Sequence, residues 1–161
     1  MKELLDKLSS YNIFNFLLPG IIFVYFVDSL TIYKLTQENL VIGIPFYYFL
    51  GLVCSRIGSL IIDPILKKIG FVKFSNYSEF IASSEKDTKI ELLSEINNMY
   101  RTFLSVFLLI FVVKLYGYLS LNCSFLSANA EYIALFGLTF IFLYSYRKQT
   151  KYISSRIGIA T

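Results

Sequence analysis

Apolar residues in this chain gather into four blocks that are separated by polar stretches. The blocks cover residues 13–33, 40–62, 102–121 and 128–146, and each contains one charged residue. The hydrocarbon core of a bilayer is about 30 Å thick, so roughly 20 residues of α-helix are needed to cross it. Each block is close to that length. The pattern therefore predicts an all-α fold, a bundle of four transmembrane helices forming a single membrane domain over residues 1–161.

The first block has a competing interpretation as a cleavable signal peptide. Its apolar run is longer than the core of a signal peptide, Asp28 interrupts its end, and no cleavage site of small residues follows. We therefore expect residues 13–33 to be retained as a membrane helix. A kink is expected at Pro19 and Gly20, because membrane helices tolerate both residues where neighbours satisfy the freed backbone groups.

Basic residues are distributed unevenly around the four blocks. Two lysines precede the first block, six basic residues lie between the second and third, and four follow the last. The opposite side carries only Lys34 and Lys114. Because cytoplasmic loops carry an excess of lysine and arginine, the imbalance predicts that both termini and the middle segment face the cytoplasm. The expected location is the inner membrane of a bacterium, with multiple passes.

Residues 64–101 form the only sizeable polar segment, and we expect them to be a cytoplasmic helical insertion. Apolar residues recur at helical spacing after Asp87, the candidate N-cap. No helix breaker precedes the third block, so one helix of roughly 48 Å is predicted from Thr88 to Leu119. A short helix is also expected to begin within 75–79 and to run through Ile81.

The mixed charges within this segment leave two interpretations open. Positive and negative residues alternate over 85–91, which is typical of a solvated helix face. The alternative is a docking surface for a cytosolic protein partner over residues 76–99. The mixed signs favour the solvated face.

The composition restricts the chemistry that the chain can perform. Its 161 residues are 56% hydrophobic, include no histidine, and contain two cysteines, Cys54 and Cys123, whose spacing matches no zinc, haem or redox motif. Phosphate-binding loops, nucleophile elbows and paired-carboxylate metal motifs do not occur in the sequence. We expect no enzymatic activity and no cofactor. The net charge of +4 is explained by topology, so direct binding of nucleic acid is not expected.

Arg56 is the most informative polar residue because it lies inside an apolar block. A charge in a membrane helix costs at least about 2.5–3.5 kcal/mol on insertion scales and usually has a partner. Helical spacing places Arg56 and Asp63 beside Ser59, while Asn12 and Asn15 lie at the same depth on the first block. The group is a candidate polar gate or ion path. The alternative is a structural ion pair in which Arg56 extends toward the inner headgroups.

Small residues recur every four positions along the second block. Gly51, Ser55 and Ser59 form a stripe that allows a neighbouring helix to approach closely. We therefore expect these three residues to pack against another helix. The stripe also leads us to expect a homo-oligomer.

Three charged residues are expected near the outer surface of the membrane. Asp28 lies near the end of the first block, Glu131 begins the fourth, and Lys114 has a comparable depth on the third. Together they are candidates for a ring of charges lining a pore. The alternative is that each simply marks the interface, where water reaches it.

Three segments carry a resemblance. YNIFNFLLPGIIF (11–23), SRIGSLIIDPILKK (55–68) and EINNMYRTF (95–103) resemble a group of small uncharacterised multi-pass bacterial membrane proteins, some of which are associated with antiphage defence loci. The resemblance covers roughly the first two thirds of the chain and transfers no functional residue. By analogy it implies an effector that assembles in the inner membrane and disrupts it.

Two functional hypotheses follow. The first is a non-enzymatic, oligomeric effector that forms an ion channel or disrupts the membrane, controlled through residues 64–101. The second is a membrane anchor or scaffold that recruits a cytosolic partner through the same segment. A transporter would be expected to show symmetry between the two halves of the chain, and the sequence has no such repeat.

Overall fold

The computed structural model describes the backbone of residues 11–160 and the side chains of residues 11–158. Within that range there are no strands, which confirms the all-α class. The elements in chain order are η1 (Ile13–Leu17), α2 (Leu18–Leu30), α3 (Leu40–Ile57), η2 (Gly58–Ile62), α4 (Asp63–Lys68), α5 (Tyr77–Ser84), α6 (Lys89–Asn122), α7 (Ser124–Ala128) and α8 (Ala130–Ala160).

Three helical stretches are long and apolar enough to cross a membrane, judged by length and composition. They are Ile13–Leu30, Leu40–Lys68 and Lys89–Asn122. The fourth predicted span, 128–146, is not among them, although α8 covers most of it. Glu131 and Arg147 bound an apolar stretch of only 15 residues, 132–146, which explains why α8 falls short on composition.

The first helical stretch ends three residues before the predicted boundary at Tyr33. Thr31 has an extended backbone, with φ −130° and ψ 174°, so the chain leaves the helix there. The Asp28 carboxylate accepts hydrogen bonds from the backbone N–H groups of Leu35 (2.6 Å) and Thr36 (3.2 Å). These bonds hold the connecting segment against the helix end, and they explain why the helix stops early.

The second stretch begins as predicted and continues beyond the expected end at Ile62. Asn39 caps it, since its side chain accepts a hydrogen bond from the Val41 N–H at 2.9 Å. The helix then runs through η2 and α4 to Lys68. Pro64 does not end it, because the π-helical turn just before this proline widens the backbone where an α-helical hydrogen bond is lost. The same arrangement of a π-helical turn, η1, precedes Pro19.

Residues 64–101 contain the short predicted helix and the start of the long one. The long helix is confirmed, because α6 runs unbroken from Lys89 to Asn122. The carboxylate of Asp87 accepts a hydrogen bond from the Lys89 N–H at 2.9 Å, although Thr88 occupies the N-cap position. The short helix α5 starts at a capping box formed by Asn76 and Glu79 and extends to Ser84, three residues beyond the predicted Ile81.

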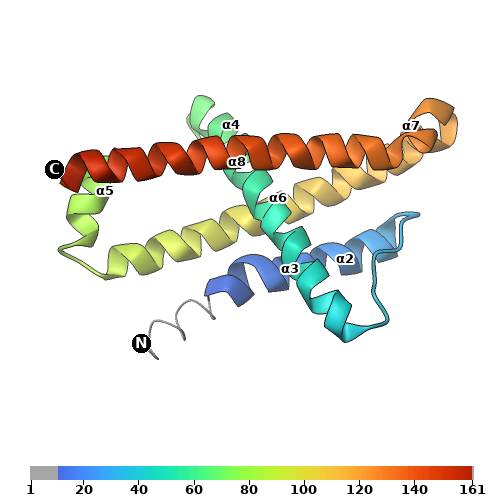
Figure 1. Cartoon of the computed structure of the whole chain (residues 1–161), viewed down its shortest axis with the longest axis horizontal. Coiled ribbons are helices and arrows are strands. Elements are labelled where there is room, and N and C mark those ends of the chain that lie inside the picture. Colours follow the sequence, from blue (N-terminus) through green and yellow to red (C-terminus); the bar gives the residue numbers. More distant parts are fainter. Residues whose placement is uncertain (1–10, 161) are drawn as a thin grey trace.

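Helices α2, α3 and α6 enclose the apolar core. Its buried members are Phe23, Val27, Cys54, Val106 and Ile110. Figure 1 shows α3 crossing the other long helices, with α8 passing over it, and α8 contacts α3 and η2. Over residues 130–158, where the α8 side chains are described, none is buried.

Different helix ends and connections lie at the two ends of the molecule. The start of η1, α5, the start of α6 and the end of α8 lie toward the left of Figure 1. The connection between α2 and α3 and the short helix α7 lie toward the right. Helix α8 therefore runs back along the direction from which α6 came, and its C-terminal turns return to α5.

Candidate polar site beneath α8

An ion pair joins the second and third helical stretches where α4 begins. An Nη atom of Arg101, on α6, lies 2.9 Å from a carboxylate oxygen of Asp63, and the two side chains are 16% and 11% exposed. Helical spacing predicted Asp63 beside Arg56, and Arg101 was expected only as one of the basic residues that set the topology. The base paired with Asp63 is Arg101, because α6 passes η2 at this level. No local spacing signals this pair, since 38 residues separate its members.

Arg56 has no ion-pair partner among the described residues. Its Nε atom is buried and makes no hydrogen bond within the part of the chain that the structure describes. The guanidinium of Arg101 is close enough to repel it. Arg56 is thus a second, uncompensated cation beside the Asp63–Arg101 pair.

A third cation enters the same region from α8. The Lys148 ammonium donates hydrogen bonds to the carbonyl oxygen and to the hydroxyl of Ser59, each at 2.7 Å. Desolvation lowers the pKa of this amine, the Asp63 carboxylate opposes that effect, and the nearby Arg101 adds to it. Sequence reasoning missed Lys148 as a site residue, because a lysine that follows an apolar block is usually explained by topology alone.

The predicted stripe of small residues faces other helices of the same chain. A Cβ atom added at Gly51 would lie 1.7 Å from the carbonyl oxygen of Phe16 and 2.9 Å from the nitrogen of Gly20. The backbones of η1–α2 and α3 therefore touch at these glycines. Ser55 and Ser59 are also buried, at 3% and 8% exposure, and Ser59 receives Lys148. The stripe is used within one chain, so it does not offer a free face for a second copy.

The asparagines of the first helix do not join this group. Asn15 is buried, and its Nδ2 donates to the carbonyl oxygen of Tyr11 at 3.2 Å. Its Oδ1 atom has no hydrogen-bond partner among the described residues. Neither Asn12 nor Asn15 makes a hydrogen bond with Arg56 or Asp63 in the described part of the chain.

Asp28, Lys114 and Glu131, the candidates for a ring of charges, are also not brought together. Asp28 is occupied by the backbone of the segment that follows α2. Lys114 and Glu131 are exposed on α6 and α8. Over residues 11–160, no hydrogen bond or ion pair links any two of these three residues. The interpretation of each as a solvated interface residue therefore fits the geometry better than a ring does.

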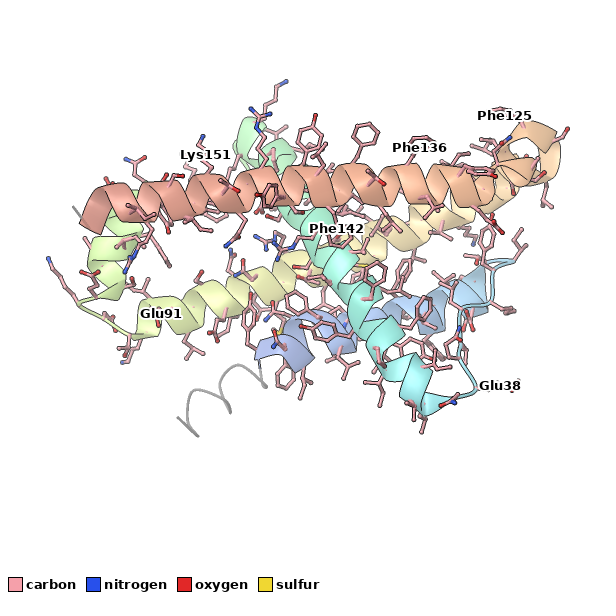
Figure 2. All side chains as sticks on the ribbon, viewed as in Figure 1. Glu38, Glu91, Phe125, Phe136, Phe142 and Lys151 are labelled. Carbon is pink, nitrogen blue, oxygen red and sulfur yellow. The ribbon has the colours of Figure 1, made fainter. Side chains whose placement is uncertain are left out.

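Helix α8 continues past the polar site and contacts the polar segment of residues 64–101. The rings of Tyr77, on α5, and Tyr152 have centroids 5.3 Å apart. An Nη atom of Arg156 lies 3.4 Å from a carboxylate oxygen of Glu85, in an exposed pair. The second half of α8, from Arg147 onward, is polar, and Figure 2 shows Lys151 there. Phe136 and Phe142 lie on the apolar first half. The end of α8 thus connects the polar site to α5.

A small cavity of about 30 Å³ lies between η2 and α8, next to Arg56 and Lys148. Ser145 also lines it, and its hydroxyl is buried without a hydrogen-bond partner in the described range. The remaining lining residues are Ser59, Leu60, Gln149 and Tyr152. No cluster of three or more histidine, cysteine, aspartate or glutamate side chains that could hold a metal ion is found among the described residues. The arrangement of cations and donor groups suits an anion.

Comparison with known proteins finds no matching protein family, no matching curated protein and no matching solved structure.

Proposed function

We propose that this chain is a non-enzymatic, four-pass protein of the bacterial inner membrane that assembles into homo-oligomers and permeabilises the bilayer as a defence effector. Control would reside in its cytoplasmic segment, residues 64–101. The observation that carries the proposal is the character of α8. This helix has a long apolar half, yet none of its described side chains over 130–158 is buried within the chain.

The fourth crossing is supported by how α8 runs relative to α6. At one end, the Tyr116 hydroxyl donates a hydrogen bond to the carbonyl oxygen of Leu126 at 2.8 Å. Leu126 lies in α7, which links α6 to α8. At the other end, Arg156 reaches Glu85, just before α6 begins. If α6 crosses the bilayer, a helix that returns beside it over the same length crosses as well. Both termini are then on the cytoplasmic side, as the basic residues predict.

Assembly is supported by the unequal use of apolar surface. The three other long helices share a core, whereas α8 exposes large side chains such as Leu135, Phe136 and Phe140, at 60%, 66% and 56%. Association of membrane helices depends on van der Waals contact and hydrogen bonds between helices. The small-residue stripe of α3 is already occupied. Apolar side chains such as Val41 (81%) and Phe111 (71%) are also exposed on α3 and α6, but those helices share the core, so we assign the second copy to the outer face of α8.

Control through the cytoplasmic segment is supported by continuous contacts. Residues of α5 touch the last turns of α8, whose Lys148 bonds to η2 inside the second membrane helix. A partner or ligand that moves α5 would therefore move α8 relative to α3. Such a displacement would alter the face that contacts a second copy.

Membrane potential tests the proposal directly. We expect induced expression in a bacterium, with neighbouring genes present, to collapse the signal of a potential-sensitive dye. If wild type and Arg56→Leu both leave the potential unchanged, permeabilisation is excluded. Assembly is tested separately by disulfide crosslinking in a Cys123→Ser background, where Phe136→Cys should form dimers. The matched control is Phe111→Cys on α6, which is also exposed (71%) and should not crosslink.

A second candidate function is a scaffold that recruits a cytosolic protein. It is favoured by apolar side chains exposed on the cytoplasmic segment, including Phe71 (77%), Leu92 (56%) and Leu93 (63%). Pull-down with wild type and with charge reversal at Lys86 and Lys89 distinguishes the two. A stable partner that is lost on reversal, in cells whose potential is unaffected, supports the scaffold.

A further inference from the structure

We infer that the polar site between η2, α6 and α8 binds the phosphate of an anionic lipid headgroup. The inference rests on the membrane placement in the proposed function, and it holds whether or not the protein permeabilises the bilayer. The cations and unused hydrogen-bond donors of the site suit a phosphate group. A phospholipid of the inner leaflet and free inorganic phosphate both supply it, and the experiment below separates the two.

The first step is the charge balance. Arg56, Arg101 and Lys148, with Lys67 nearby, converge on a region whose one carboxylate, among the described residues, is Asp63. Asp63 is already bonded to Arg101. Two positive charges are left without a partner of opposite sign, and a buried charge is costly unless it is paired. An anion with a charge of −1 or −2 would compensate them.

The second step is the direction of the unused hydrogen-bond donors. The Nε–H of Arg56 and the hydroxyl of Ser145 are buried and have no partner among the described residues. Both side chains line the cavity of about 30 Å³. Buried donors of this kind usually have an acceptor, and an unaccounted ion is one of the standard explanations. Phosphate oxygens accept strong bonds from guanidinium and ammonium groups.

The third step is the size and place of the cavity. A volume of 30 Å³ exceeds the roughly 10–15 Å³ that one water requires, so it admits a phosphate oxygen while the rest of the headgroup stays outside. The site lies where Lys67 and Arg147 flank the apolar parts of their helices. This is the depth of the cytoplasmic headgroups in the proposed topology. Basic pockets between membrane helices on that side are a known setting for anionic lipid headgroups.

The fourth step is what bound phosphate would do to the structure. Lys148 on α8 and Arg56 on α3 come from helices that share few other contacts. A phosphate held by both would fasten α8 to α3 at the cytoplasmic end. Anionic lipid is therefore expected to stabilise the position of α8 in particular.

The test uses the full-length protein purified in a neutral detergent. Its thermal unfolding is followed while phosphatidylglycerol, phosphatidylcholine or inorganic phosphate is added in separate titrations. We expect phosphatidylglycerol to raise the melting temperature of wild type. In Lys148→Met the apparent affinity for phosphatidylglycerol should fall about tenfold, since one charge-assisted hydrogen bond is lost. Lys148→Arg should retain most of it.

A control separates this site from general attraction to charge. Lys151→Met removes the same charge from the same helix, but Lys151 is exposed and does not line the cavity. It should leave the titration unchanged. Ser145→Ala, which removes an unused donor and no contact made within the described chain, should weaken binding about twofold to threefold.

Each outcome decides the inference. If phosphatidylglycerol and phosphatidylcholine stabilise wild type equally, or if Lys151→Met weakens binding as much as Lys148→Met, the site does not exist as described. If inorganic phosphate matches phosphatidylglycerol at equal concentration, the site binds phosphate but the lipid source is wrong. A loss of affinity for phosphatidylglycerol confined to Lys148→Met and Ser145→Ala supports the inference. That result stands even if the separate test in cells shows no change in membrane potential.

Discussion

The molecule contains two regions that hold their helices in different ways. Helices α2, α3 and α6 share an apolar core, and η1–α2 and α3 touch at glycines, so backbone meets backbone at Gly20 and Gly51. Helix α8 has none of these features in its described part. Its glycines, Gly137 and Gly158, have no neighbouring atom within 4 Å of an added Cβ. It is attached by a few side-chain contacts, chiefly Lys148 with Ser59 and Phe142 with Phe49.

The difference shows which helices pack closely against one another within the chain. Close contact of small residues is how membrane helices bind when lipid offers no hydrophobic driving force between them. The pair of η1–α2 and α3 satisfies that condition, and α6 packs against both through the apolar core. Helix α8 satisfies it poorly, so we propose α8 as the element whose position depends on a second copy or on lipid.

The largest expected effect comes from adding a methyl group where the helices touch. In Gly51→Ala the new Cβ would lie 1.7 Å from the Phe16 carbonyl oxygen, so η1–α2 and α3 must separate. We expect a loss of about 3 kcal/mol in the free energy of unfolding, at the upper end of overpacking effects. Gly137→Ala on α8 is the matched control and should be neutral or slightly stabilising. Equal effects in unfolding titrations with a denaturing detergent would contradict the comparison.

The next effect concerns the two ion pairs. Asp63→Asn removes the partner of Arg101 and leaves three cations together, so we expect about 2 kcal/mol of destabilisation, less than the roughly 3–5 kcal/mol of fully buried pairs. Glu85→Gln breaks the exposed pair with Arg156 and should cost under about 1 kcal/mol. The same unfolding titration measures both. If Glu85→Gln lowers the free energy of unfolding more than Asp63→Asn does, the end of α8 is bound more tightly than its contacts indicate.

A smaller effect distinguishes the two faces of α8. Phe142 stacks on Phe49, with ring centroids 6.0 Å apart and planes at 15°, so Phe142→Ala should lower stability by about 1 kcal/mol. Phe136 points away from the other helices in Figure 2 and is 66% exposed. Phe136→Ala should leave the monomer's stability unchanged and weaken oligomers, which analytical ultracentrifugation in detergent detects. Loss of monomer stability in Phe136→Ala would contradict this assignment.

Helix positions were predictable from the sequence wherever the signal is local. The apolar blocks located every long helix, and the absence of a breaker between Thr88 and Leu119 correctly predicted one continuous α6. Boundaries failed where a hydrogen bond or a change of helix type overrode the local pattern of residues. The first helix ends early because Asp28 binds the following backbone, and the second passes Pro64 because a π-helical turn absorbs the proline.

The polar site was only half visible in the sequence. Arg56 and Ser59 were found because a charge and small residues stand out within an apolar block. Arg101 and Lys148 were not, because each follows or precedes a block and is explained equally well by topology. Their pairing with Asp63 and Ser59 depends on which helices lie side by side, across 38 and 89 residues of chain. Periodicity within one helix carries no information about that.

Accessibility of single cysteines tests the central claim, that α8 crosses the membrane and returns the chain to the cytoplasm. Cys123 is natively exposed at the end of α6, and Cys54 is buried. A membrane-impermeant thiol reagent applied to intact cells at low expression should label Cys123. In a Cys123→Ser background, Ser154→Cys and Lys86→Cys should react only after the membrane is opened, with Lys86→Cys serving as the control for leakage. Labelling of Ser154→Cys in intact cells, while Lys86→Cys stays protected, would contradict the account.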